Sequence, residues 1–512
     1  MKAKLISLLL ILLMLCGCSS HGSNDSDSSE NYTPEPGGTI KLACFVPDTL
    51  NPLATKYQNV RDVMMVAYEG LFKAEDTLVA IPVLATGYTV STSNKIYSIS
   101  LKNNIKFHDG SEFDADDVIA TFDYIKEYDT PYSPIFENVL DYNKTDKYSV
   151  TVELISPQAD FVNNLDFPIL TSGLSERSFS QEDTAFIPNG TGRYKYSSRV
   201  HNKNLTLVRN DDWHGDKPSY PDKVFVSFMH NSTDLFHAFD AGEIDIFTTN
   251  GSNWGEFNFT TNNKCFETGS PRYTYIGINT ERDKLKDVTL RQDINNLIDR
   301  KEMVETVMFS HAVPAKLPII STSYYFDYKS PDGNNPSQAQ KAPEILKYDI
   351  TLGLLYNNES KLKERAANYL KKEFETYGIT LNLRPVNFDD YKEYIEEGEY
   401  DLYLGEVIMN NNMNMDFMFS SVQNSSQNLC TFLNSEFDTM LANHNMMSPD
   451  KENHELTFYN FEKYFTENVP QIPLFHSNSA LFVNNRIKGE IKANMSSFYG
   501  DIGDLFINYK EK

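Results

Sequence analysis

The residue types that perform catalysis are present in this chain, but not at the spacings that catalysis requires. His454-Glu455 lacks the second histidine of a zinc-protease helix. Gly190-x-Gly192 is followed by neither a third glycine nor a P-loop lysine, so we interpret it as a turn. No Gly-x-Ser-x-Gly motif occurs. The sequence predicts no catalytic residues, no metal site and no cofactor, and an exported hydrolase remains only as an alternative.

Side chains suited to binding a solute follow three predicted strands, in loops with amide, aromatic and charged groups. In open α/β sheets, ligands bind beyond the carboxyl ends of strands, where loops and helix N-termini converge. We therefore expect one site lined by these loops. The candidates are Lys56 and Tyr57 in the loop at 54–58, Asn357 in the loop at 357–358, and Glu406, Asn410 and Asn412 in the loop at 406–416.

The elements that must position the later loops alternate between strand and helix. Thr351–Tyr356, Ile379–Val386 and Tyr400–Val407 have the pattern of strands. Lys361–Tyr377 repeats apolar residues at helical spacing, and Phe388–Glu397 is a shorter helix. The order β-α-β-α-β favours a parallel sheet with right-handed crossovers.

The first half of the chain has a different pattern. Thr39–Val46 alternates like a strand, and Val60–Phe72 is expected to be helical. Residues 76–185 are mainly short strands with one good helix, which Asp114 can cap. Tyr273–Ile278 is a further strand.

Length and charge restrict the class of protein. The 512 residues suffice for two or three compact units, and 40% are apolar, so sizeable cores can form. The net charge of −25 argues against sequence-independent binding to nucleic acid and against charge-driven adhesion to anionic lipid.

The first residues predict export and a lipid anchor. Lys2 and Lys4 precede the apolar run Leu5–Leu15, which is too short to span a bilayer. Leu15-Cys16-Gly17-Cys18 resembles the bacterial lipobox, with Cys18 as the acylated residue; an ordinary cleaved secretion signal is the alternative. Residues 1–18 are therefore a signal peptide and 19–36 a flexible tether to the outer face of the cell membrane, extracellular or periplasmic.

The cysteines that remain after cleavage are Cys44, Cys265 and Cys430. An odd number in an exported chain implies no disulfide framework. We expect small buried hydrophobic side chains, although one pair remains possible.

Six stretches together resemble a known family, in the order in which that family has them. The resemblance is to the family 5 extracellular solute-binding proteins of ABC importers, the peptide- and nickel-binding group, and it runs from about Gly37 to the C-terminus. The stretches are Phe107–Val118 with its Asp-Gly turn before Ala-Asp-Asp-Val, Pro188–Tyr194 with Gly-Thr-Gly-x-Tyr, Leu207–Trp213, Ala241–Asp245, Asp287–Arg300 and Pro470–Leu474.

The resemblance implies an α/β fold of the two-lobed periplasmic-binding-protein type II class, in its three-subdomain, cluster C form. Two hinge strands, near Tyr273–Asn279 and Leu474–Val483, would join the lobes. Lobe I would comprise 37–75, 186–276 and 480–512, with an inserted subdomain at 76–185, and lobe II would comprise 277–479. The lobes would close on a solute, and the closed form would dock on a membrane permease.

The resemblance also implies partners: an oligopeptide or other small solute, an ABC permease with its ATPase, and the membrane through Cys18. It implies a monomer that binds no nucleic acid. A nickel chelate and an oligosaccharide remain alternative ligands, and a surface receptor for a signalling peptide remains an alternative role.

The chain departs from the peptide-binding pattern after Tyr400-Asp401-Leu402. Asn410 occupies the place of the acid that pairs with a peptide's amino group. Glu406 is the expected substitute, and Lys56 is the expected clamp for a carboxylate. Tyr57 and Tyr275 could stack on a ligand, although Tyr275 also fits a core position.

Overall fold

The computed structural model describes residues 34–175, 186–249, 263–323, 349–421, 431–446, 454–493 and 498–508. Residues 36–512 form one compact unit, which holds every element named below. The predicted signal peptide with Cys18, most of the predicted tether, and Cys430 lie outside the described residues. Within the described ranges, no helix has both the length and the apolar character needed to cross a membrane.

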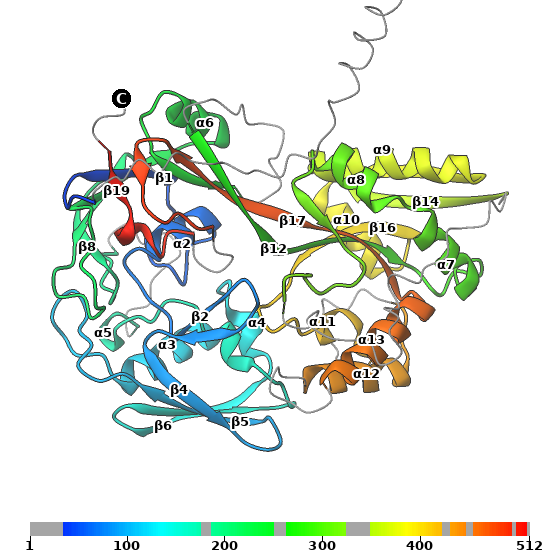
Figure 1. Cartoon of the computed structure of the whole chain (residues 1–512). Helices are drawn as coiled ribbons and strands as arrows, with labels where there is room; N and C mark the ends of the chain where they lie inside the picture. Colours follow the sequence, from blue (N-terminus) through cyan, green and yellow to red (C-terminus); the bar gives the residue numbers. More distant parts are fainter. Residues whose placement is uncertain are drawn as a thin grey trace, which may run out of the picture. The chain divides into compact units, whose positions relative to one another are not determined.

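Most strands of the described chain belong to one mixed sheet (Figure 1). A further strand, β13 (Ala312–Pro314), pairs with β17 beside the main order. From edge to edge the order is β15 (Ile379–Val386), β14 (Ile350–Asn357), β16 (Leu402–Ile408), β12 (Asn263–Ile278), β17 (Gln471–Asn484), β11 (Ile246–Thr249), β1 (Thr39–Phe45), β10 (Lys223–Met229), β9 (Asn204–Arg209) and β8 (Tyr194–Val200).

The two long central strands, β12 and β17, connect the two halves of this sheet (Figure 1). They pair antiparallel with each other, β12 also pairs with β16, and β17 also pairs with β11. Their register shifts between Gly269 and Tyr273. Such an irregularity bends a strand and increases its local twist. Both segments that the sequence assigned to hinges overlap these strands.

The predicted parallel unit is confirmed. β14 pairs in parallel with both β15 and β16, and α9 (Lys361–Thr376) and α10 (Phe388–Glu396) form the crossovers. The Ser360 hydroxyl accepts the Lys363 backbone N–H at the start of α9, and Asn387 caps α10 in the same way. Leu362, Ala366, Leu370 and Phe374 form the buried stripe of α9.

The strand-rich region after residue 76 contains a separate antiparallel sheet in the order β4 (Ala85–Val90), β5 (Ile96–Leu101), β7 (Ser149–Leu154) and β6 (Val139–Asp146). Its helix, α3 (Ala115–Glu127), begins as predicted: the Asp114 carboxylate accepts the Asp116 N–H, and Asp117 completes a capping box. This sheet shares one apolar core with β1 and β10.

The helix predicted over Val60–Phe72 is wrong in length. Helix α2 covers only Gln58–Met64, residues 65–71 are turn or irregular, and Phe72 already belongs to β2 (Phe72–Ala74). Backbone groups after α2 bond to distant segments instead, since Gly192 N–H donates to Ala67 C=O and Ile169 N–H to Glu69 C=O. Tertiary hydrogen bonds therefore replace a helical pattern that local sequence favoured.

The described chain has further helices and short strands outside the two sheets above. They are β3 (Ala80–Pro82), α4 (Ser133–Phe136), η1 (Phe161–Asn164), α5 (Ser172–Ser175), α6 (Ser232–Asp240), α7 (Val288–Leu297), α8 (Arg300–Val307), α11 (Asp416–Phe419), α12 (Ser435–Asn445), α13 (His454–Asn468), β18 (Ile487–Lys488), η3 (Ile502–Asp504) and β19 (Phe506–Ile507).

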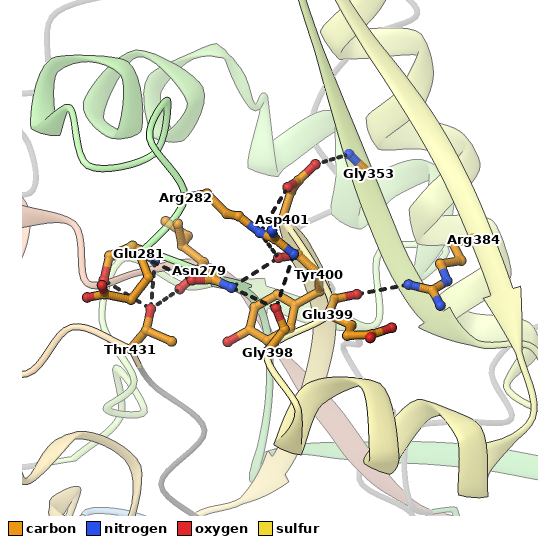
Figure 2. A network of polar contacts seen from close by, with 12 residues as sticks. Asn279, Glu281, Arg282, Gly353, Arg384, Gly398, Glu399, Tyr400, Asp401 and Thr431 are labelled. Atoms are coloured by element: carbon orange, nitrogen blue, oxygen red, sulfur yellow. Dashed lines mark hydrogen bonds and ion pairs between the residues drawn. The ribbon is translucent and has the colours of Figure 1, made fainter.

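A polar network fixes the chain just before β16 (Figure 2). The Asn279 amide donates to the Gly398 and Tyr400 carbonyls at 3.0 and 3.1 Å. Arg282 donates to the same two carbonyls, and the Asp401 carboxylate accepts the Gly353 N–H at 2.9 Å. The start of β16 is thus tied to β12 and β14, and this fixes where its carboxyl end emerges.

Tyrosine and glycine pair reciprocally where β12 meets β16. Tyr275 lies opposite Gly405, and Tyr403 lies opposite Gly277. A Cβ atom on Gly405 would lie 2.3 Å from Tyr275 Cζ, and one on Gly277 would lie 2.0 Å from Tyr403 Cε1. Each ring therefore covers the backbone of the neighbouring strand, which only glycine leaves open.

We expect Gly405→Ala to lower the free energy of unfolding by about 1–3 kcal/mol, because the added methyl group must displace the Tyr275 ring. Urea unfolding measures the change. Gly173→Ala is the matched control, since nothing lies within 4 Å of its added Cβ, and it should leave stability unchanged or slightly higher. Equal stability of Gly405→Ala and the wild type would contradict this packing.

Candidate functional site

A cavity of about 1210 Å³ lies among segments that are far apart in the sequence. One side comes from the end of β1, from α2 and from α6. A second comes from residues 131–138, 155–158 and 164–166, in the region of the antiparallel sheet. The third comes from β12 near Arg272 and from the chain at 407–417 after β16. The long strands β12 and β17 contribute to it directly, through residues 270–272 and Ser479.

The first side is a loop organised by one carboxylate. Asp48 accepts hydrogen bonds from the Thr49 N–H, the Thr55 hydroxyl and the Lys56 N–H, so the chain curls around it. This conformation brings Tyr57 to the start of α2 and its ring to 6.2 Å from the Phe45 ring, edge to face. The Tyr57 side chain stays 43% exposed, so its apolar surface is available to a ligand.

The second and third sides touch through one amide. Asn411, in the chain after β16, donates from Nδ2 to Asp166 Oδ2 at 2.9 Å and to the Asn163 carbonyl at 3.1 Å. Asp166 and Asn411 both line the cavity. The Asn411 side chain therefore links the chain after β16 to residues 163–166, which follow the antiparallel sheet.

Comparison with known proteins fits this arrangement of segments. The family model described as "Bacterial extracellular solute-binding proteins, family 5 Middle" matches residues 79–428. The chain belongs to this family. The expected resemblance is thereby confirmed over more than half of the chain.

Individual relatives of this solute-binding protein are distant but match over most of its length. The oligopeptide-binding protein AppA of Bacillus subtilis is 23% identical, over 95% of each chain. The heme-binding protein A of Haemophilus influenzae is 22% identical, over 82% of this chain and 83% of its own.

Solved structures show the same fold. The substrate-binding protein CtaP of Listeria monocytogenes superposes with a TM-score of 0.75 at 21% identity, covering 93% of this chain and 100% of its own. AppA in complex with a nonapeptide gives a TM-score of 0.66 at 21% identity, with the same coverages. The predicted α/β, type II periplasmic-binding-protein fold is confirmed.

Three of the predicted site residues line the cavity of this solute-binding protein. Lys56 and Tyr57 come from the loop before α2, and Asn410 comes from the chain after β16. The prediction from strand ends therefore identified lining residues on the first and third sides of the cavity.

Four predicted site residues do not line it. Tyr275 is 7% exposed and its ring covers Gly405, so it belongs to the core. The Asn357 side chain accepts the Glu359 N–H and shapes the turn before α9. Asn412 is 4% exposed, and its Oδ1 accepts the Asn414 N–H. Glu406 faces Arg272, at 2.6 Å.

Three charged residues of the lining are not predicted from the sequence: Arg272, Asp62 and Asp166. Arg272 directly precedes the predicted hinge Tyr273–Asn279, and its position there is the one available clue. Asp62 lies one turn along α2 from Gln58, which donates to it at 2.7 Å. Asp166 follows a short 3₁₀ turn, and no motif distinguishes it.

Burial raises the pKa of both aspartates. The pKa of Asp62 rises to about 6, although hydrogen bonding from Gln58 and the charge of Arg61 oppose the rise. The pKa of Asp166 also rises to about 6, opposed by the Asn411 hydrogen bond. Neither carboxylate forms an ion pair with a described residue. Weakly compensated carboxylates in a cavity are typical of functional sites.

Metal-ligating side chains do not gather in this site. Over the part of the chain that the structure describes, no group of three His, Cys, Asp or Glu side chains could hold a metal ion. Cys44 and Cys265 are free thiols.

We expect Asp166→Asn to raise the free energy of unfolding at pH 7.5 by about 1–3 kcal/mol, because a pKa raised by two units disfavours the charged form. Between pH about 4 and 6 the native carboxyl binds protons that the unfolded one has released, so wild-type stability falls as the pH rises through this window. The free energy of unfolding of the variant should therefore decrease less than that of the wild type over the same pH window.

Denaturant unfolding at pH 4.5 and 7.5 measures both effects. Asp283→Asn, whose carboxylate is fully exposed, is the control and should change neither value by more than about 0.5 kcal/mol. Lower stability of Asp166→Asn at pH 7.5 would mean that the charged form is favoured in the native protein.

Proposed function

We propose that this protein captures an oligopeptide in the cavity and delivers it to the permease of an ABC transporter. The observation that carries the proposal is the size of the cavity together with its origin in segments of both sheet halves and of the antiparallel region. About 1210 Å³ exceeds the range of roughly 300–1,000 Å³ that small-molecule pockets occupy. The relative AppA, whose length this chain matches, is an oligopeptide-binding protein.

The chemistry of the lining supports a peptide. Apolar and aromatic side chains such as Phe45, Tyr57, Tyr132, Phe236 and Phe417 supply surfaces for ligand side chains. A second set consists of amides, which can pair with peptide N–H and C=O groups without selecting a sequence: Gln58, Asn59, Asn138, Gln158, Asn164, Asn410, Asn411 and Asn414.

Both signs of charge are present in the lining, as a zwitterionic ligand requires. The cationic groups are Lys56, Arg61 and Arg272, and the anionic groups are Asp62, Glu137 and Asp166. Tryptophan, which suits sugar stacking, does not occur among the lining residues of the described chain. An oligosaccharide is therefore a weaker candidate than a peptide.

The domain limits expected from the sequence form part of the proposal. Lobe I comprises 37–75, 186–276 and 480–512, the inserted subdomain comprises 76–185, and lobe II comprises 277–479. Ligand binding shifts the population toward lobes closed about β12 and β17, and the permease docks on that closed form. The register shift at Gly269–Tyr273 supports a hinge at this point.

The proposed setting is the outer face of the cell membrane. Family members are extracellular solute-binding proteins. Acylation of Cys18 anchors the chain, residues 19–36 act as the tether, and the protein works as a monomer without catalytic activity.

The test is native mass spectrometry of the soluble form beginning at Ser19, purified from cells grown in rich medium without refolding. We expect co-purified masses that denaturation releases and that fragment as peptides. The same protein after unfolding, dialysis and refolding is the control, and it should be empty.

Discrete non-peptide masses would overturn the peptide assignment in favour of a chelate or another solute. An empty protein that also fails to bind any member of a tryptic casein peptide pool would overturn the capture of peptides. Ligand cleaved during long incubation would contradict a role without catalysis.

A further inference from the structure

Arg272 and Glu406 form a charged pair at the edge of the cavity. The sequence predicted that the anionic group, Glu406, would meet the ligand, but the residue that lines the cavity is the cationic one. Glu406 was the expected partner for a ligand ammonium group. In the structure its Oε1 accepts a hydrogen bond from Arg272 Nη1 at 2.6 Å, and both side chains are about 20% exposed. Arg272 lines the cavity, whereas Glu406 does not.

The position of Arg272 follows from the register of the strands. In the pairing of β12 with β16, Arg272 lies opposite Ile408, and Glu406 lies opposite Thr274, two residues further along β12. The Arg272 backbone N–H donates to the Ser270 hydroxyl at 3.2 Å, within the irregular stretch between Gly269 and Tyr273. Bulged strands redirect side chains, and here an arginine reaches the cavity directly before the buried run Tyr273–Ile278 of β12.

The guanidinium retains donors for a ligand. An arginine carries five N–H groups in a planar fork. To the described residues this guanidinium donates one hydrogen bond, from Nη1 to Glu406. The edge formed by Nε and Nη2 is thus left for another acceptor. That edge has the geometry of two parallel hydrogen bonds to a carboxylate.

Glu406 is the one described carboxylate that pairs with Arg272. The anionic residues of the lining, Asp62, Glu137 and Asp166, make no ion pair with Arg272. An anionic ligand group would therefore be a second counter-charge for this guanidinium.

We propose that Arg272 binds a carboxylate group of the captured solute and that Glu406 is a positioning residue that holds the guanidinium for this contact. The proposal rests on the proposed function and specifies its ligand: a peptide with a free C-terminal or side-chain carboxylate. Lys56, the clamp expected from the sequence, is then secondary, since its side chain lies in an exposed loop.

The test uses the soluble protein from Ser19, unfolded and refolded to remove bound solute, and a pool of tryptic casein peptides. One half of the pool is left as free acids, and in the other half all carboxyl groups are converted to amides. Native mass spectrometry measures capture from each half. We expect the wild type to capture the free acids at least about tenfold better than the amides.

Variants assign this selectivity to a residue. In Arg272→Gln, capture of free acids should fall to the level of the amides, and Arg272→Lys should retain only part of the selectivity because a point charge lacks the fork. Lys286→Gln, which removes an exposed cation outside the lining, is the control and should keep wild-type selectivity. A thermal melt verifies that each variant is folded.

Two further variants test the positioning role. Glu406→Ala should lose most of the selectivity, whereas Glu406→Gln keeps an acceptor for Arg272 Nη1 and should restore it. Had Glu406 bound a ligand ammonium, Glu406→Gln would instead lose lysine-rich peptides first. Unchanged selectivity in Glu406→Ala would show that Arg272 needs no positioning partner.

The remaining outcomes distinguish failure of the carboxylate contact from failure of the proposed peptide capture. Equal capture of both pools by the wild type, or full selectivity in Arg272→Gln, would overturn the carboxylate contact while leaving peptide capture intact. A selectivity lost equally in Lys286→Gln would assign it to general charge and also overturn the contact. Folded wild-type protein that captures neither pool would count against peptide binding itself.

Discussion

The antiparallel pairing of β12 with β17 is the constraint on which the remaining structure depends. These strands, of 16 and 14 residues, carry backbone hydrogen bonds from one half of the sheet to the other. Each also pairs with a strand of only one half, β12 with β16 and β17 with β11. The cavity lies where the register of the pair is interrupted, so its residues there are placed by strands that must also accommodate any relative motion of the halves.

The close packing beside this interruption explains why Arg272 lines the cavity and Tyr275 does not. The rings of Tyr275 and Tyr403 cover glycines of the opposite strand, and neither residue lines the cavity. Arg272, at the bulge, is not held by that pattern and reaches the cavity. The same strand therefore supplies a core tyrosine and a cationic group three residues apart.

Two carboxylates of the lining destabilise the folded protein at neutral pH. Asp62 and Asp166 have pKa values raised by burial, which makes their charged forms costly at neutral pH. The positive charge of Arg272, by contrast, is partly compensated by Glu406. The cavity lining therefore carries charged groups of both signs.

The sequence by itself determined the family, through the resemblance of six stretches to it. It also determined the parallel unit of β14, β15 and β16, the cap of α3, and the convergence of the loops after β1 and β16 on one cavity, because these follow from local periodicity, capping and strand order. Only the tertiary structure decided the length of α2, the burial of Tyr275 and Asn412, and the pairing of Glu406 with Arg272. The partners of Tyr275 and Glu406 lie more than a hundred positions away in the chain and are set by strand register. A charged side chain in a loop can therefore be predicted to lie near a site, but which opposite charge it meets is set by the register of the strands that bring the two together.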